Sequence, residues 1–532
     1  MDPHADVVFL NGKVITIDPS NNVFEAVAVR GNTIQRVGTT QDILSAADEQ
    51  TLQIDLKGRA LLPGFNDCHC HPGHYGTTKL RGFISPDTVG SIEDIQRELT
   101  EKTKVTPKGD WIVARGYDHS RLAENRHPNK WDLDAVAPDH KVFITRLCGH
   151  VSVANSKTLN HFDITKNTPD PEGGKIDRDQ HGEPTGILYE HAQIPIRLAT
   201  EPSFEESETG MALMNRDFLK NGITSAQDAS GRNPNEIVLF QKGSSQIRIY
   251  FMVRISGENI RLGEQYLTSG LRTGFGNERL RLGSLKLQMD GAGGSATAAM
   301  RTPYPQDPAN FGVLHMNQDA LDDLVGRGHN AGYQIGVHAI GDRAIEMTLQ
   351  SFEKALLSNP RKNHRHRIEH CGILDKPLME KMAELGVVAA LGLPFLYSLG
   401  DSYIHAFTDE QLQYAYPLKS LMQRGIIAGL SSDAPVIDPN PLYGIYVAVT
   451  RKTDSGQRVA PNEAVSVMDA LRAYTLHSAF LSFEEHIKGS IEVGKLADLV
   501  VLSRDILETP PDDIPGIAVD LTMLDGNIVY QR

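Results

Sequence analysis

Two histidines end an apolar run near the N-terminus, in the stretch Leu-Leu-Pro-Gly-Phe-Asn-Asp-Cys-His-Cys-His at residues 61–71. His69 and His71 are two positions apart, and on a β-strand residues i and i+2 point to the same face. Their imidazoles should therefore lie side by side where the strand meets its loop, a geometry that binds a divalent metal. Cys68 and Cys70 alternate with them, so we expect the two thiols to pack behind the strand. Extra zinc ligands are the other interpretation of these cysteines.

Later strand-like runs carry four more residues suited to metal binding or proton transfer. His338 ends Gln-Ile-Gly-Val-His, His370 ends Arg-Ile-Glu-His, and Asp433 follows Ile-Ile-Ala-Gly-Leu-Ser-Ser. Lys286 lies within Ser-Leu-Lys-Leu-Gln-Met-Asp at residues 284–290. Imidazoles and carboxylates are ligands for divalent metals and also transfer protons. Together with the first two histidines, this ordered series predicts a metal-dependent hydrolase.

Lys286 is expected to point towards the interior. Strand alternation places Leu285, Leu287 and Met289 against the surrounding helices, and Lys286 with Asp290 on the opposite side. An ammonium inside a protein is unfavourable unless it is paired or chemically altered. A buried ion pair between Lys286 and Asp290 is therefore one interpretation, and a modified lysine is the other.

The middle of the chain alternates strand-like and helix-like segments, which indicates parallel strands joined by crossover helices. Helical patterns cover residues 319–330 and 342–357, for example. The eight predicted strands are residues 65–71, 223–228, 247–253, 284–289, 334–338, 367–370, 387–391 and 426–431. Eight such units predict an α/β fold of the (β/α)8 TIM-barrel type, in which catalytic groups come from the C-terminal ends of the strands.

The first and second predicted strands are separated by roughly 150 residues, far more than a usual βα loop. This stretch contains two further strand-like runs, Trp111–Tyr117 and Val142–Leu147. We therefore expect residues 72–220 to form largely an inserted cap over the barrel mouth.

Both ends of the chain consist of short β-rich runs with hairpin turns such as Asn11-Gly12 and Asp525-Gly526. Neither end is long enough to fold well alone. We expect residues 1–64 and 480–532 to form one small β-sandwich domain, with residues 65–479 forming the metal-dependent barrel between them.

Five ordered motifs resemble those of the amidohydrolase superfamily. The closest resemblance is to its branch of long metal-dependent hydrolases that includes the N-substituted formamide deformylases. The motifs are Leu-Pro-Gly-Phe-Asn-Asp-Cys-His-Cys-His (62–71), Leu-Lys-Leu-Gln-Met-Asp-Gly (285–291), Val-His-Ala-Ile-Gly-Asp-Arg-Ala (337–344), Arg-Ile-Glu-His (367–370) and Ser-Ser-Asp-Ala-Pro-Val (431–436). The tail Gly-Lys-Leu-Ala-Asp-Leu-Val-Val-Leu (494–502) resembles the superfamily's return to the β-sandwich, so the resemblance covers essentially the whole chain.

This resemblance implies a site with two divalent metals, most simply two zinc ions. Manganese, iron and cobalt are alternatives, because mixed histidine and carboxylate sites accept several metals. Lys286, carboxylated by carbon dioxide, would bridge both ions, which removes the cost of a buried ammonium. Asp433 would take the proton from the water and pass it to the leaving nitrogen. The other implied ligands are His69 and His71, with Asp433, for the more buried metal, and His338 and His370 for the outer one.

Other polar residues near the predicted ligands have two interpretations each. His150 matches a family position in the insert where a histidine approaches the substrate, but it could equally be a loop or capping histidine. His74 is expected to be a loop residue. Glu369 and Asp342 lie beside ligands and could orient an imidazole through its second nitrogen. Asp342 could equally be the acidic residue expected at a helix N-terminus.

The leading functional prediction is hydrolysis of an amide-type C–N bond in an N-acyl, N-formyl, carbamate or cyclic amide substrate. A one-metal deaminase of an amino-heterocycle is the alternative. Such enzymes tend to carry a glutamate shortly after the fifth-strand histidine and to lack the bridging lysine. Here the run is His338-Ala-Ile-Gly-Asp-Arg, and Lys286 is present. A non-catalytic scaffold would typically have lost metal ligands, and this chain keeps all six.

Composition narrows the choice of partners. The net charge of -14 over 532 residues argues against nucleic acid or an anionic membrane as the main partner. The chain has neither a signal-peptide pattern at its start nor an apolar run approaching the roughly 20 residues of a membrane span. Four cysteines do not suggest a disulfide framework. We expect a cytoplasmic enzyme with a small-molecule substrate, with a homodimer or larger homo-oligomer as one option.

Overall fold

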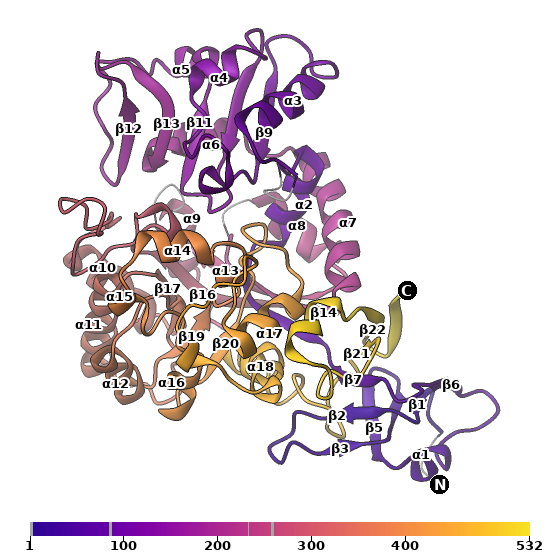
Figure 1. Ribbon diagram of the computed structural model, residues 1–532. Helices are drawn as coiled ribbons and strands as arrows, with labels where there is room; N and C mark the ends of the chain where they lie inside the picture. The colour runs from indigo at the N-terminus through magenta and orange to yellow at the C-terminus, as the bar shows by residue number, and fades with distance from the viewer. Residues whose placement is uncertain (1–3, 85–87, 232–233, 257–259) are drawn as a thin grey trace.

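A computed structural model describes residues 4–84, 88–231, 234–256 and 260–532 (Figure 1). Its centre is a sheet of eight parallel strands, arranged in the order in which they follow one another along the chain. The strands are β8 (Phe65–Cys70), β14 (Ile223–Asp228), β15 (Arg248–Arg254), β16 (Leu280–Gln288), β17 (Ile335–Ala339), β18 (Arg367–His370), β19 (Val388–Leu391) and β20 (Ala428–Leu430). Each of the eight predicted barrel strands is present, and the predicted (β/α)8 barrel is confirmed.

Helices surround this sheet, because each parallel strand needs a crossover to reach the next one. The helices between successive strands include α7 (Phe204–Lys220), α8 (Pro234–Gln241), α9 (Ile260–Thr268), α10 (Gln318–Asn330), α11 (Asp342–Ser358), α12 (Lys376–Leu385) and α16 (Leu418–Gln423). Shorter or later helices are α13 (Phe395–Ser398), α14 (Gly400–Ala406), α15 (Asp409–Leu412), α17 (Pro441–Thr450), α18 (Val467–Arg472) and α19 (Ser478–Leu481). Within the described ranges, none of the helices has the length and apolar character needed to cross a bilayer.

Two further sheets are built from the ends of the chain. The first has the order β5-β4-β1-β6, and the second has the order β23-β22-β21-β7-β2-β3. Their strands are β1 (Val7–Leu10), β2 (Lys13–Ile15), β3 (Val23–Phe24), β4 (Ala26–Arg30), β5 (Thr33–Gly38), β6 (Leu52–Asp55), β7 (Ala60–Pro63), β21 (Leu499–Leu502), β22 (Val519–Leu524) and β23 (Asn527–Gln531), with α1 (Thr40–Leu44) beside them.

A shared apolar core joins these two sheets. Val27 from the first sheet packs in one buried cluster with Leu61, Leu499 and Met523 from the second. Residues from both termini thus fill the same interior, as expected for a sandwich in which each sheet hides one face. The predicted sheet domain made from both termini is confirmed, while the boundaries 1–64 and 480–532 stay predictions.

The long connection after β8 forms a separate five-stranded sheet, on the opposite side of the barrel from the terminal sheets (Figure 1). Its order is β12-β13-β11-β10-β9, and its strands are β9 (Trp111–Arg115), β10 (Lys141–Thr145), β11 (Val151–Ala154), β12 (Gly174–Arg178) and β13 (Pro184–Glu190). The helices of this segment are α2 (Pro72–Arg81), α3 (Ile92–Thr103), α4 (Lys130–Asp134), α5 (Ser156–His161) and α6 (Ile194–Ala199).

The inserted segment has an apolar core of its own. Ile95 and Leu99 of α3 are buried together with Ile112 of β9 and Val142 of β10, so the insert is a folded cap and not an extended loop. The two strand-like runs predicted inside it are present as β9 and β10. Its first helix, α2, packs against α7 beside the barrel. The range 72–220 stays a prediction for the limits of the cap.

Candidate metal centre

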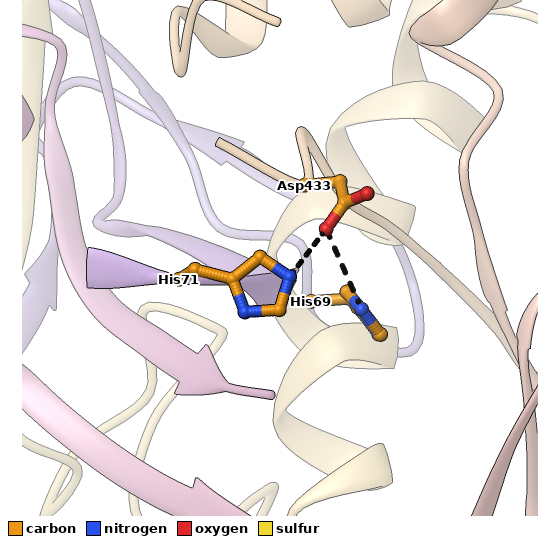
Figure 2. Close-up of side chains that lie close together, drawn as sticks. All are labelled: His69, His71 and Asp433. Atoms are coloured by element: carbon orange, nitrogen blue, oxygen red, sulfur yellow. Dashed lines mark ion pairs between the residues drawn. The ribbon is translucent and has the colours of Figure 1, made fainter. Parts of the chain in front are cut away.

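Three side chains converge on one point (Figure 2). Two come from the C-terminal end of the β8 segment, and the third follows β20. One nitrogen each of His69 and His71 and one oxygen of Asp433 all lie within 4.8 Å of one another. Asp433 Oδ1 is 2.9 Å from His71 Nε2 and 3.6 Å from His69 Nε2. Two imidazoles and a carboxylate are donors typical of a catalytic divalent metal, so the residues present fit such an ion.

The backbone at the seam of the barrel holds these groups together. β8 and β20 are the two ends of the strand order, and their C-terminal segments meet. Asp433 donates its backbone N–H to the carbonyl of His69 at 2.8 Å, and His71 donates its N–H to the carbonyl of the residue after Asp433 at 2.8 Å. The Ser432 hydroxyl donates to Asp67 Oδ2 at 2.5 Å. Asp433 has a φ of 55°, a left-handed conformation that persists only where the surroundings impose it.

The second nitrogen of each histidine has its own partner, which fixes the ring. His69 Nδ1 lies 2.5 Å from Glu369 Oε2, and His71 Nδ1 lies 2.9 Å from Ser230 Oγ. Each ring therefore turns its Nε2 towards Asp433, as in metal sites where a carboxylate orients the ligand histidine. A Cβ at Gly336 would lie 2.6 Å from Glu369 Oε1, so only glycine leaves room for this carboxylate. The contact expected between Glu369 and a predicted ligand is present.

Lys286 lies on β16 inside the barrel, and its side chain is 5% exposed. Its Nζ is 3.5 Å from His69 Nε2, and within the described residues it forms no ion pair with a carboxylate. Burial lowers the pKa of this lysine to about 8. Asp290 instead accepts backbone N–H groups of Ala299 and Gly341 at 2.9 and 2.8 Å. The interpretation of Lys286 and Asp290 as a structural ion pair is therefore wrong.

His338 and His370 continue the same group of rings. The ring centroid of His370 lies 4.6 Å from that of His69 and 4.5 Å from that of His338. His338 Nε2 is 3.0 Å from the carbonyl oxygen of Gly291, so Nδ1 is the nitrogen left for a ligand. Burial lowers the pKa of both His338 and His370, which favours the neutral imidazole that a metal requires. Their role as outer ligands stays a prediction.

His150 reaches this site from the cap. Its ring centroid lies 5.7 Å from that of His338, and its Nδ1 is 2.8 Å from Glu190 Oε2. His315 Nε2 lies 3.4 Å from the same Glu190 oxygen. Burial would lower the pKa of His150, but the charge of Glu190 and the hydrogen bond to it outweigh burial and raise the pKa to about 9. Glu190 therefore favours the protonated form of His150 beside the predicted metal ligands.

The structure also places two minor candidates, His74 and Asp342. His74 is part of helix α2 and not of a loop, with its Nε2 2.9 Å from Nη1 of Arg115. Asp342 begins helix α11 and pairs with Arg301 at 3.0 Å. Of its two interpretations, the helix N-terminal charge is therefore the one that matches its contacts.

Three buried polar residues at the site were not singled out by the sequence. Asp67 precedes His69 by two positions and so shares its face, a signal that strand periodicity offers. Glu190 and Arg146 lie at or just after the ends of cap strands β13 and β10, but no motif spacing distinguishes them from ordinary surface charges.

A cavity of about 210 Å³ lies between the cap and the barrel. Cap residues Val113, Phe143 and Thr145 line it on one side. All seven predicted site residues also line it: His69, His71, His150, Lys286, His338, His370 and Asp433. A substrate bound there would be in contact with the candidate metal ligands and with the cap.

The fold and site are thus those of a (β/α)8 barrel with a candidate metal centre at the C-terminal ends of its strands. The family model described as "Amidohydrolase family" matches residues 53–530, and the chain belongs to this family. Membership of this family supports metal-dependent hydrolysis of an amide-type C–N bond. The resemblance inferred from the five motifs is confirmed.

Relatives span the whole chain. A Bacillus subtilis (strain 168) protein named "Putative amidohydrolase YtcJ" is 30% identical over 539 residues, which cover 99% of this chain and 99% of that protein. An "N-substituted formamide deformylase" of Arthrobacter pascens is 28% identical over 556 residues, covering 100% of this chain and 99% of that enzyme. The crystal structure of an uncharacterized metal-dependent hydrolase from Pyrococcus horikoshii OT3 has a TM-score of 0.75 and 25% identity, covering 95% of this chain and 99% of that one.

Proposed function

We propose that the protein hydrolyses small N-acyl amides with a short acyl group, such as N-formyl compounds, at a centre of two divalent metals, most simply zinc. Lys286, once carboxylated, would supply an anionic ligand to these metals. The observation that carries this proposal is the buried amine of Lys286, which lies 3.5 Å from His69 Nε2 without a carboxylate partner in the described chain. A carboxylated amine would be an anionic ligand at this position, where the charge of an ammonium acts against protonation of His69, His338 and His370.

The protein's own groups would divide the remaining work. His69 and His71 with Asp433 would hold one metal, and His338 with His370 the other. Bound there, such a pair lowers the pKa of a shared water and polarises a carbonyl oxygen. Asp433 Oδ1 faces the two histidines, so Oδ2 is the atom that would take the proton from water and return it to the leaving nitrogen.

His150 completes the arrangement. Glu190 occupies its Nδ1, so its protonated Nε2 is the atom that would donate to the substrate carbonyl. The cap that carries His150 would also exclude bulk water from the reacting atoms, which strengthens each of these interactions.

The preference for a short acyl group rests on the space around the ligands. Beside the cavity of about 210 Å³ lies a chamber of about 20 Å³ that shares three predicted ligands with it. A chamber of this size holds roughly one or two water-sized groups. The part of the substrate on one side of the cleaved C–N bond, which would enter this chamber, must therefore be short. The similarity to a relative named for N-substituted formamides favours the acyl side as the short one.

A matched set of substrates tests the proposal. Metal-replete protein would be assayed with the formyl, acetyl and benzoyl derivatives of one aromatic amine, together with a carbamate, a lactam and an amino-heterocycle. We expect the amine to be released fastest from the formyl compound and slowest from the benzoyl compound. Release of ammonia from the heterocycle alone would identify a deaminase and contradict the proposal.

A second experiment tests the bridging lysine. Lys286→Ala should lose metal and activity together, and short-chain carboxylic acids should partly restore both, because a free carboxylate can occupy the bridging position. Lys362→Ala, which removes an exposed lysine, is the matched control and should retain both. Full metal content and turnover in Lys286→Ala would exclude the bridge. The cytoplasmic location and a homo-oligomeric state stay predictions.

A further inference from the structure

Arg146 is a fully buried cation next to the candidate metal centre. It follows β10 in the cap, and 0% of its surface is exposed. Its Nη2 donates to Asp118 Oδ1 at 2.8 Å, and its Nε donates to His119 Nδ1 at 3.1 Å. Its Nη1 is also buried but has no hydrogen-bond partner among the described residues. A buried donor without an acceptor is costly and calls for an explanation.

This guanidinium lines the small chamber of about 20 Å³. Phe395 and Leu399 form part of its apolar wall, and the thiol of Cys148, a weak acceptor, is within hydrogen-bonding reach of Arg146 and raises its pKa. Three predicted metal ligands line the same chamber: His338, His370 and Asp433. Arg146 and His150 are therefore the two cationic hydrogen-bond donors that line this space, which adjoins the reacting centre, and Arg146 is the one that contributes a guanidinium.

The charge of Arg146 is already compensated. Asp118 supplies a carboxylate at 2.8 Å, and His119 accepts through Nδ1, as expected for a neutral ring whose pKa burial lowers to about 4. The group that this site lacks is thus an acceptor atom and not a counter-charge. A hydroxyl or carbonyl oxygen meets that need with a smaller desolvation cost than a second anion.

We propose that Arg146 is a specificity-determining residue that donates from Nη1 to an oxygen on the acyl part of the substrate. The preferred acyl group is short and carries a hydroxyl or carbonyl oxygen one or two bonds beyond the reacting carbon, as in a hydroxyacetyl amide. This inference rests on the proposed function, because it places the acyl group in the small chamber. The inference adds that the chamber prefers an acyl group with a polar oxygen, and that Arg146 is the residue responsible for this preference.

Two carboxylates of nearly equal size test the inference by direct binding. Glycolate and propionate differ in a terminal hydroxyl against a methyl group, and both resemble the acid released from such a substrate. Isothermal titration calorimetry on the metal-replete protein should give a Kd for glycolate at least about tenfold lower, since a charge-assisted hydrogen bond contributes about 1.5–3 kcal/mol. Equal dissociation constants, or no binding of either acid, would overturn the inference.

One variant separates Arg146 from the metals, which could themselves bind the hydroxyl of glycolate. Arg146→Lys keeps the charge beside Asp118 but loses the planar donor fork, so the preference for glycolate should vanish. A preference that persists in this variant would assign it to the metals and reject the role of Arg146. Hydrolysis of formyl amides does not depend on the contact with Arg146. An assay of formyl-amide hydrolysis therefore tests the proposed function separately from this inference.

Gly294→Ala provides an independent variant that leaves Arg146 in place. Its new Cβ would lie 3.3 Å from Ser402 Cβ and 3.9 Å from Arg146 Nη2, so the methyl group would narrow the chamber and Ser402 would have to shift slightly. Binding of glycolate and propionate should weaken several-fold while binding of formate is retained. Wild-type affinities for all three acids would show that the chamber does not hold the acyl group. Metal content and the thermal unfolding curve serve as controls for both variants.

Discussion

Replacing Glu190 with glutamine should move the alkaline limb of the pH–rate profile to lower pH. Glu190 Oε2 lies 2.8 Å from His150 Nδ1, and both side chains are largely buried. Burial alone would lower the pKa of His150, yet Glu190 raises it to about 9. Glutamine keeps the shape and a hydrogen bond but removes the charge, so burial then determines the pKa.

The size of this effect follows from the pKa shift. Raising a histidine from its ordinary value near 6.5 to about 9 corresponds to a net stabilisation of the protonated ring by about 3 kcal/mol, after the opposing effect of burial. At pH 7.5 the protonated fraction of His150 should fall from about 97% to below about 10%. If protonated His150 donates to the substrate, kcat/KM at this pH should fall about tenfold, and the loss should be smaller at pH 6.

The assay compares the wild type, Glu190→Gln and His150→Ala between pH 5.5 and 10, with metal content measured for each. Glu183→Gln is the matched control, because Glu183 is exposed just before the start of the same strand.

The thermal stability of the protein should also depend on the contact between His150 and Glu190. A raised histidine pKa stabilises the protein below pH 6.5, and this contribution is lost as pH rises through about 9. The deficit in melting temperature of Glu190→Gln should therefore be larger at pH 6 than at pH 9.5. An unchanged alkaline limb in Glu190→Gln, with full metal content, would refute the reasoning, and loss of metal in His150→Ala would make His150 a ligand or support.

Three further changes have defined outcomes. Asp433→Asn should keep the fold but lower turnover roughly 100-fold or more and weaken the acidic limb, because general-base catalysis contributes about that much; wild-type turnover would mean that another group activates the water. Dialysis against a chelator should abolish turnover, and added zinc should restore it; turnover that survives measured metal loss would contradict a metal-dependent reaction. Gly76→Ala should destabilise the protein by about 1–3 kcal/mol, because its Cβ would lie 2.0 Å from the carbonyl oxygen of Gly210 where α2 packs on α7. Gly326→Ala, in helix α10 with open space around the new Cβ, is the control and should not lower the melting temperature in the same thermal unfolding measurement.

Local patterns sufficed to place the elements of the barrel. Strand periodicity put His69 and His71 on one face, and it placed Lys286 in the interior of β16. In a (β/α)8 barrel the C-terminal ends of the strands lie together at one mouth. This rule predicted that residues from five distant segments form one site. The sequence could support these inferences because they depend only on spacing within a strand and on the order of strands.

The tertiary structure decided which of these side chains actually meet. The 2.8 Å bond from Asp433 to the carbonyl of His69 forms across the seam where the barrel closes, and Glu369 reaches His69 only because of the register of β18. Glu190 and Arg146 lie near the predicted ligands only because the cap packs on the barrel. Contacts of this kind join residues tens to hundreds of positions apart, and their geometry depends on register, twist and packing. No local pattern encodes them, whereas the positions of the strands and of the candidate ligands follow from the sequence itself.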